Sequence, residues 1–226
     1  MHRPPSTSSS PAPTLPERRG TALLEFRGLT VRFGDHVVLD RLDLALEAGR
    51  AVAVVGPNGA GKSTALRCAV GAEAPTLGEV LFDGAPLDET SPAFRASVAA
   101  ALDDAASFPD LSVVEHLLVV AWAHGVDDPA VVNAAVVDCG LRSVRDNLPA
   151  TLSSGQARRL ALASCLVRPR RALVLDEPEQ RLDESGHDWL RERLLAEKAA
   201  GTAVLFASHH SALVDAVADD VVTVAP

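Results

Sequence analysis

The chain has 226 residues, which suits one domain, and its 47% hydrophobic content is enough for a substantial core. The formal net charge of −9 argues against a general nucleic-acid binder, because neutralising phosphates needs clustered Lys and Arg. Three widely spaced cysteines, Cys68, Cys139 and Cys165, match neither a metal-ligand pattern nor a secreted disulfide scaffold, so we expect buried thiols in a reducing compartment. No apolar run approaches the roughly 18 residues of a membrane span, so any membrane role would come through a partner.

Residues 1–20 are rich in Pro and Ser and almost free of large apolar side chains. Such a composition cannot build a packed core, so we predict a disordered tail. The segment also lacks the apolar stretch of a secretory signal. We place the folded domain at residues 21–226.

From residue 23 onward, short apolar segments alternate with helical patterns. Continuous apolar runs predict strands that are covered on both faces of a parallel sheet, and they lie at 51–55, 172–175 and 203–207. A further strand is predicted at 221–224. Other segments are joined by Gly- and Asp-containing turns, which is typical of antiparallel strands, and they lie at 23–33, 37–46 and 79–82.

The middle of the chain, about 104–168, has a helical pattern. Ser112 and Glu115 form a capping box ahead of an apolar helix. Asp128, followed by a proline, begins a second helix. We therefore predict a helical subdomain that interrupts the sheet, which resumes near Ala172.

A phosphate-binding motif follows the apolar strand at 51–55. The stretch Gly56-Pro57-Asn58-Gly59-Ala60-Gly61-Lys62-Ser63-Thr64 matches G-x-x-x-x-G-K-[ST], and a helical pattern begins near Ser63. In this setting the backbone N–H groups surround phosphates, and the helix N-terminus adds its positive end. We expect Lys62 to pair with the β- and γ-phosphates of a nucleotide and the Ser63 hydroxyl to ligate Mg²⁺. The strand and helix around the motif disfavour the alternative, a glycine-rich turn with an exposed lysine.

Two acids, Asp176 and Glu177, follow the apolar run at 172–175. An acid at the carboxyl end of a parallel strand lies where such sheets bind ligands. We predict that Asp176 holds Mg²⁺ through its water shell and that Glu177 polarises an attacking water. A solvated strand end is the alternative for these two residues taken alone.

Between these sites lies Leu152-Ser153-Ser154-Gly155-Gln156, followed by a helical stretch at 157–163. Together with the phosphate loop and the two acids, this segment closely resembles the ABC-transporter ATPase family. In that family the LSGGQ signature binds the γ-phosphate of the ATP held by the opposite subunit. The resemblance implies this role for Ser153, Gly155 and Gln156, with Ser154 in place of the usual first glycine. A plain N-capped helix is the alternative.

Three further positions resemble the same family. Asp183 matches the D-loop, which connects the two sites across the dimer. His209, after the strand at 203–207, matches the histidine that contacts the γ-phosphate, although His210 is adjacent and a structural histidine is the alternative. Phe33 falls where the family places an aromatic side chain that stacks on adenine. A core phenylalanine is the alternative there.

One position departs from the family. Its Q-loop glutamine, a Mg²⁺ ligand at the boundary with the helical subdomain, should fall near Leu102, and Asp103 stands there instead. Asp103 is shorter by one methylene group but could reach the metal through water. We therefore predict it as a metal ligand with retuned coupling to the partner, against the alternative of a solvated acidic loop.

The resemblance covers about residues 23–224. It implies an α/β fold: a P-loop NTPase core with a mostly parallel sheet, a small antiparallel β subdomain and an inserted α-helical subdomain. The implied reaction is ATP hydrolysis with Mg²⁺, in which Lys62, Glu177 and His209 are the catalytic residues.

The implied partners are membrane-spanning permease subunits and a second ATP-binding subunit, in a homo- or heterodimer, with no nucleic acid. Such a subunit is cytoplasmic and lies on the cytoplasmic face of the cell membrane through its partner. Two alternatives remain open: a soluble ABC-type ATPase that serves assembly or repair, and a regulatory ATP-binding module with weakened catalysis.

Overall fold

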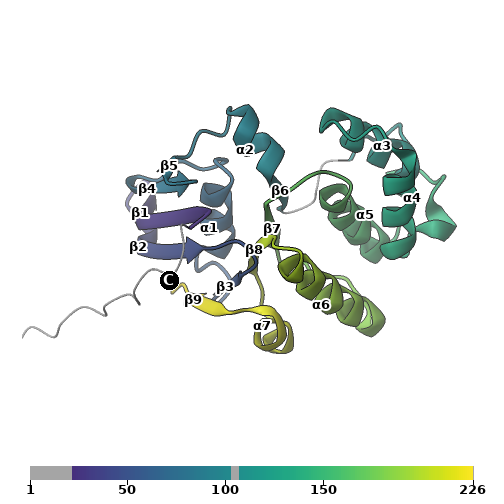
Figure 1. Ribbon diagram of the computed structural model, residues 1–226. Coiled ribbons are helices and arrows are strands. Elements are labelled where there is room, and N and C mark those ends of the chain that lie inside the picture. The colour runs from purple at the N-terminus through teal and green to yellow at the C-terminus, as the bar shows by residue number, and fades with distance from the viewer. Residues whose placement is uncertain (1–21, 103–106, 226) are drawn as a thin grey trace, which may run out of the picture.

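The computed structural model describes residues 22–102 and 107–225, which form two sheets (Figure 1). The antiparallel strands are β1 (Leu24–Phe33), β2 (His36–Leu46), β4 (Leu77–Phe82) and β5 (Ala85–Pro86). The parallel strands are β3 (Ala51–Val55), β6 (Val98–Ala101), β7 (Ala172–Asp176), β8 (Ala203–Ala207) and β9 (Asp220–Thr223). Their orders are β2-β1-β4-β5 and β6-β7-β8-β3-β9.

The described helices are α1 (Lys62–Ala69), α2 (Pro92–Ser97), α3 (Val113–Ala123), α4 (Pro129–Asp138), α5 (Ser154–Leu166), α6 (Glu184–Ala199) and α7 (Ser211–Val217). Two short 3-10 turns, Arg142–Val144 and Pro149–Thr151, precede α5. None of the helices within 22–102 and 107–225 is long and apolar enough to cross a membrane.

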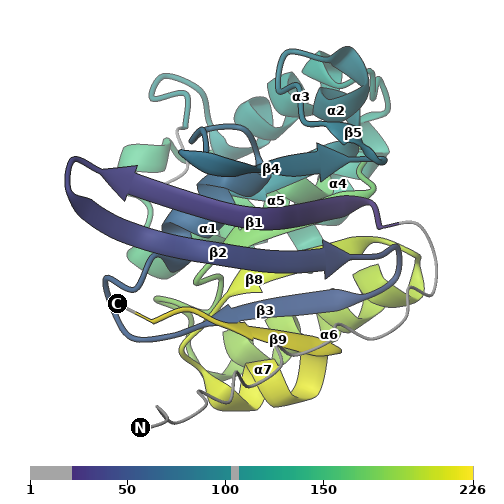
Figure 2. The same ribbon diagram turned by 90° about the vertical axis from the view of Figure 1, so that its left-hand side faces the viewer.

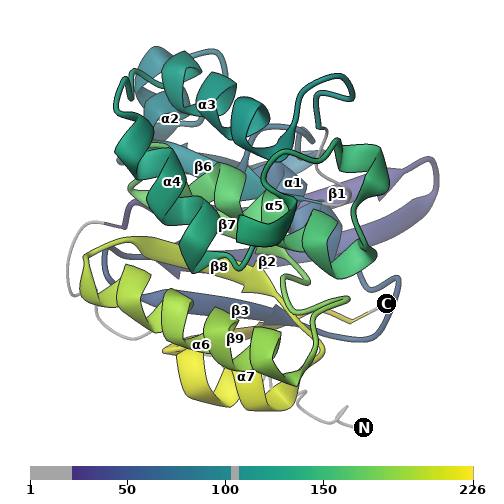
Figure 3. The ribbon, with the colours of Figure 1, turned by 90° about the vertical axis from the view of Figure 1, so that its right-hand side faces the viewer.

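The parallel sheet separates two cores because successive side chains of a strand point to opposite faces. On β3, Val52 and Val54 join the cluster that contains the antiparallel sheet and α1. Ala51 and Ala53 face the other way, into a cluster with residues of α5, α6 and α7. Figures 2 and 3 show these two sides, the antiparallel sheet toward the viewer in the first and the helices in the second. Cover on both faces explains the continuous apolar runs of these strands.

Helices α3, α4 and α5 share a third core, seen to the right in Figure 1. Helix α5 belongs to two cores at once. Its Leu160 and Ala163 pack with α3 and α4, whereas Leu162 and Cys165 pack against the parallel sheet. This helix therefore joins the helical part of the chain to the sheet.

Two serines begin helices with the same reciprocal cap. Ser112 caps α3 and Ser153 caps α5. In each case the side chain three positions on, Glu115 or Gln156, accepts a hydrogen bond from the serine N–H. The predicted box at Ser112 is confirmed. Asp128 caps α4 by accepting a hydrogen bond from Ala130 N at 2.9 Å.

The predicted fold class is confirmed, and the corrections are local: strand β5 was not predicted, and β4 begins at Leu77, two residues earlier than predicted. The sequence prediction missed strand β6, which pairs with β7 at the edge of the parallel sheet. Strand β9 begins one residue earlier than predicted, at Asp220. The tail predicted at residues 1–20 lies outside the described residues, and the limits of the helical subdomain stay a prediction.

The three cysteines are buried and free, as expected. Burial raises the pKa of each thiol to about 12. These side chains therefore act as small apolar residues of the cores.

Candidate active site

The site is built at the carboxyl ends of three neighbouring strands, β7, β8 and β3. The loop 56–61 follows β3 and leads into α1. Asp176 ends β7 and Glu177 follows it, and His209 follows β8. Because these strands are parallel and adjacent, their carboxyl ends meet at one edge of the sheet. Residues that are more than a hundred positions apart in the chain are thereby brought together.

Two glycines of the loop have no room for a side chain. A Cβ at Gly56 would lie 2.2 Å from Val224 O, and one at Gly61 would lie 2.8 Å from Val38 O. Gly61 also has a φ of +96°, in the left-handed region that favours glycine. The loop is therefore packed between β2 and the chain that follows β9. Its Pro57, Asn58 and Gly59 are exposed, Ala60 is buried, and Thr64 is half-buried in α1.

Lys62, Glu177 and His209 meet at this edge. Lys62 is only 5% exposed, and its Nζ donates to Gly56 O at 3.1 Å and Pro57 O at 3.2 Å. The same Nζ lies 2.7 Å from His209 Nε2 and 3.9 Å from Glu177 Oε1. His209 Nε2 lies 3.0 Å from Glu177 Oε1. The three predicted catalytic side chains thus share one small region.

The contacts of His209 Nε2 compete with each other. An ammonium can only donate, and an ionised carboxylate can only accept. Nε2 therefore accepts from Lys62 when the ring proton is on Nδ1, and donates to Glu177 when the proton is on Nε2. One proton position cannot satisfy both neighbours, so the tautomer of the imidazole decides which contact is made.

The backbone of Glu177 is held in a sharp turn. Its φ is +45°, which is uncommon for a residue other than glycine. Glu177 N donates to Ala207 O at 3.0 Å, which ties the turn to the end of β8. Strained backbone of this kind persists where the surrounding structure holds it, and it is concentrated at functional sites. The side chain remains 21% exposed.

The residues predicted to hold Mg²⁺ fit that ion by their chemistry. Asp176, 6% exposed, offers a carboxylate at the end of β7, and half-buried Ser63 offers a hydroxyl in the first turn of α1. Residues 22–102 and 107–225 contain no cluster of three or more His, Cys, Asp or Glu that would hold a metal. Mg²⁺ is usually bound by one or two carboxylates together with phosphates and water, so a fuller cluster is not needed. Asp103, the other predicted ligand, lies outside the described residues.

The residues that match the signature lie elsewhere. Ser153 Oγ accepts from Gln156 N at 3.2 Å, and Ser153 N donates to Gln156 Oε1 at 2.9 Å. Ser153 is exposed, and Gly155 and Gln156 are half-buried. A Cβ at Gly155 would lie 2.7 Å from Arg181 O, so only glycine lets the start of α5 approach the chain before α6 this closely.

Asp183 belongs to the same neighbourhood as the signature turn. It caps α6 by accepting from Gly186 N at 2.9 Å, and its Oδ1 lies 3.4 Å from Arg159 Nη2 of α5. The Gly186 N–H and the Ser185 hydroxyl hold the pKa of Asp183 below its usual value. Within the described part of the chain, no hydrogen bond or ion pair joins Ser153, Gln156 or Asp183 to the Lys62 region.

Phe33 lies at the end of β1 and is 52% exposed, so the alternative of a core phenylalanine is wrong. The exposed ring is available for stacking. His210 is not part of the Lys62 region in the described contacts. Its Nδ1 accepts from Leu213 N at 3.2 Å and caps α7.

Sequence reasoning missed three polar residues beside the site. Glu179 is buried and hydrogen-bonds to Ser208 and His209, and Arg158 of α5 donates to the carbonyls of Asp176 and Pro178. The available signals were the serine directly before His209 and a second acid two positions after Glu177.

Known proteins match this chain closely enough to assign it to a family. A family model described as "ABC transporter" matches residues 39–180. The Nod factor export ATP-binding protein I of Cupriavidus metallidurans is 33% identical over 192 residues, which are 84% of this chain and 63% of that protein. The spermidine/putrescine import ATP-binding protein PotA of Nitrosomonas europaea is 33% identical over 83% of this chain and 53% of its own length. The chain thus spans less than two thirds of these relatives.

Solved structures agree in fold. One described as the structure of an ATP-binding subunit of an ABC transporter has a TM-score of 0.81, with 26% identity over 89% of this chain and 85% of that one. A dimeric ATP-binding cassette bound to ADP and Pi has a TM-score of 0.79 at 20% identity, over 89% of this chain and 94% of that one. At this identity the second likeness concerns the fold alone.

Proposed function

The chain belongs to the ABC transporter family, and from that membership we propose that it binds ATP with Mg²⁺ and hydrolyses it as the energy-coupling subunit of a transporter. The observation that carries the proposal is the meeting of Lys62, Glu177 and His209 at the carboxyl ends of three adjacent strands. A cation that neutralises phosphate charge and a side chain that positions the attacking water are recurring parts of phosphoryl-transfer sites, and the His209 imidazole lies beside both.

Each side chain has a defined task in this proposal. The Lys62 ammonium and the loop N–H groups stabilise charge on the β- and γ-phosphate oxygens. Ser63 and Asp176 hold Mg²⁺, which neutralises phosphate charge when it is bound. Glu177 takes a proton from the attacking water, whose oxygen forms the new bond to the γ-phosphorus. The bond from the γ-phosphorus to the bridging oxygen breaks, and ADP leaves with that oxygen and its electron pair. His209 is placed to contact the γ-phosphate, and Phe33 to stack on adenine.

A second ATP-binding subunit completes the site in this proposal. Ser153, Gly155, Gln156 and Asp183 make no hydrogen bond or ion pair with the Lys62 region among the described residues, and Ser153 is exposed on the surface. Their role is therefore to face the nucleotide of a partner subunit, where the Ser153 hydroxyl and the start of α5 favour an anion. Hydrolysis would then depend on closure of the dimer, which is how it could do work on a further partner.

The further partner would be a membrane-spanning permease, with this chain on the cytoplasmic face of the membrane. Support comes from the names of its relatives, which are ATP-binding proteins of an exporter and of an importer. Export and import proteins are equally similar to this chain, at 33% identity, and their substrates differ. The proposal therefore extends to a transporter subunit and not to a direction of transport or a substrate.

Replacing Glu177 by Gln tests the enzymatic proposal. The substitution keeps the size of the side chain but removes its charge, so we expect kcat to fall by about 10²- to 10⁴-fold, the usual contribution of a general base. Equilibrium binding of Mg-ATP should persist, because Lys62 and the loop are unchanged. Phosphate release and nucleotide binding would be measured on the same preparation.

The matched control is Glu192→Gln, the same change at an exposed position on α6, which should leave kcat unaltered. A Glu177→Gln variant with wild-type turnover would contradict the role of Glu177. Wild-type protein that binds Mg-ATP without turnover would instead favour a regulatory module with weakened catalysis.

A further inference from the structure

Glu179 connects the loop after β7 to the loop after β8. It is only 7% exposed, and its Oε1 accepts hydrogen bonds from the Ser208 hydroxyl and, at 3.3 Å, from His209 N. Ser208 Oγ in turn accepts from His210 N at 2.9 Å. One carboxylate oxygen thus organises the backbone and the hydroxyl group on both sides of His209.

The chemistry of a carboxylate gives this chain of hydrogen bonds a direction. An ionised carboxylate only accepts, so the Ser208 hydroxyl must donate to Glu179. The lone pairs of Ser208 are then free to accept from His210 N. An apolar side chain at position 179 would leave the buried Ser208 hydroxyl and the part-buried His209 N–H without this partner.

Glu179 is costly for the protein to bury. Its Oε2 is buried and has no hydrogen-bond partner within the described residues. An unsatisfied buried oxygen destabilises a fold, so its presence calls for an explanation other than stability. A buried cation lies nearby: burial lowers the pKa of Arg158, and the charges of Glu179 and Asp176 oppose that effect.

Glu179 holds the backbone of His209, the residue whose Nε2 has two competing contacts. His209 Nε2 lies 2.7 Å from Lys62 Nζ and 3.0 Å from Glu177 Oε1, and it cannot satisfy both at once. The position of the ring proton therefore selects one neighbour, and a shift of the His209 backbone changes the distance of Nε2 from both. The backbone N–H of the same residue is fixed by Glu179.

We propose that Glu179 is a positioning residue, which holds His209 in the orientation that ATP hydrolysis requires. This inference rests on the proposed ATPase function, because the activity it affects is turnover at the Lys62 site. Glu179 does not touch the nucleotide and acts through Ser208 and the His209 backbone.

The kinetic test compares two replacements of Glu179. Glu179→Leu removes the acceptor and should lower kcat by about 10²-fold, the usual effect of displacing a catalytic group by about 1 Å, with KM for Mg-ATP little changed. Glu179→Gln keeps a carbonyl oxygen that can accept from Ser208 and His209, so it should restore most of kcat. A Leu variant with wild-type kcat, or a Gln variant as slow as Leu, would overturn the inference.

A spectroscopic readout separates this inference from the proposed function. In protein labelled at histidine, the ring signals of His209, identified by their absence in His209→Ala, should move in Glu179→Leu and return in Glu179→Gln. His124, whose Nδ1 contacts Val120 O at 2.8 Å in α3, is an internal control that should not move. Unmoved His209 signals would refute the positioning role even if the ATPase is active, and moved signals in a protein without turnover would refute only the ATPase.

Ser208→Ala keeps the test decisive if the Leu variant does not fold. It removes one of the two donors to Glu179 and leaves His209 N, so it should shift the His209 signals in the same direction by a smaller amount. Unchanged signals in Ser208→Ala would overturn the proposed chain of contacts.

Discussion

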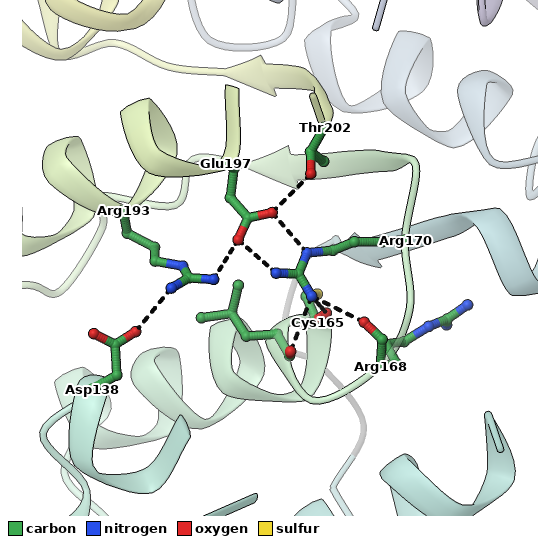
Figure 4. A network of polar contacts seen from close by, with 8 residues as sticks. Asp138, Cys165, Arg168, Arg170, Arg193, Glu197 and Thr202 are labelled. Carbon is green, nitrogen blue, oxygen red and sulfur yellow. Dashed lines mark hydrogen bonds and ion pairs between the residues drawn. The ribbon is translucent and has the colours of Figure 1, made fainter. Parts of the chain in front are cut away.

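Two buried glutamates, Glu197 and Glu179, are held in opposite ways. Glu197 is 3% exposed on α6, and both of its oxygens are paired, with Arg170, Arg193 and Thr202 (Figure 4). Glu179 is 7% exposed, and only one of its oxygens has a described partner. The partners of Glu197 are two cations and a hydroxyl, whereas those of Glu179 are a hydroxyl and a backbone amide.

The two glutamates also connect different parts of the structure. Arg170 also donates from Nη1 to the carbonyls of Cys165, Leu166 and Arg168 at 3.3, 2.9 and 2.9 Å, so it closes the C-terminal end of α5. Its Glu197 contacts therefore fix one helix against another. Glu179 instead fixes a loop that carries His209. Removing one partner of the paired Glu197 would therefore destabilise the fold, whereas the partly paired Glu179 has the proposed task of positioning His209.

Arg170→Ala should give the largest effect on stability. It leaves Glu197 with one cation and removes a donor from three carbonyls, so we expect a loss of about 3–5 kcal/mol in the free energy of unfolding. At temperatures where the variant is folded, kcat should stay near the wild-type value. Urea unfolding and phosphate release would be measured on the same samples.

The matched control is Arg191→Ala on α6, the helix that carries Glu197. Arg191 pairs with Asp188 at 2.9 Å, but both side chains are substantially exposed, so the loss should be within about 1 kcal/mol. Equal losses in the two variants, or a low kcat in stable Arg170→Ala, would remove the distinction between the two glutamates.

Acid should act on Glu197 in a predictable direction. Burial raises the pKa of Glu197, but hydrogen bonds and charge from Arg170, with Arg193 and Thr202, outweigh it and hold the pKa below the usual 4.5. The unfolded chain then binds more protons at this group than the folded one. The stabilisation is therefore present above the unfolded-state pKa and is lost as pH falls through the lower folded-state pKa.

Glu197→Gln tests the contribution of this carboxylate to the pH dependence of stability. The free energy of unfolding would be measured in urea from neutral pH to below pH 4.5. The variant keeps one acceptor oxygen for the arginines, and Arg170 keeps its bonds to the three carbonyls, so its loss at neutral pH should be smaller than that of Arg170→Ala. Its stability should also fall less steeply with acid than that of the wild type. Glu192→Gln should retain the wild-type slope, and a wild-type slope in Glu197→Gln would contradict the assignment.

The features that the sequence predicted well are local ones. The glycine loop before Lys62, the serine caps and the continuous apolar run at 172–175 are each encoded in a few consecutive residues. Strand β6 has no such signal, since three of its four residues are alanine and its edge position comes from pairing of Val98 with Ala172. Its existence depends on a contact that no local pattern records.

The contacts of Glu179 could not be predicted for the same reason. They require Asp176 to lie opposite Ala207 in the pairing of β7 with β8, which sets the loops after these strands side by side. The separation of Ser153 and Asp183 from the Lys62 region is likewise a property of the folded chain. Lys62, Glu177 and His209 could be named from sequence because each follows a recognisable strand, but their competing contacts could not.

The smallest effects on stability are expected at the two capping boxes. They have the same chemistry, but only the box at Ser153 belongs to the proposed ATP site. Ser112→Ala and Ser153→Ala each remove the same N-cap hydroxyl, so each should lower the free energy of unfolding by about 0.5–2 kcal/mol. Only Ser153→Ala should also lower kcat, because in the proposed dimer Ser153 faces the nucleotide of the partner subunit. The two variants therefore control for each other in urea unfolding and in phosphate release, measured at protein concentrations where the subunits associate. Equal turnover in both would mean that the start of α5 is only a capped helix, and that the Lys62 region works without it.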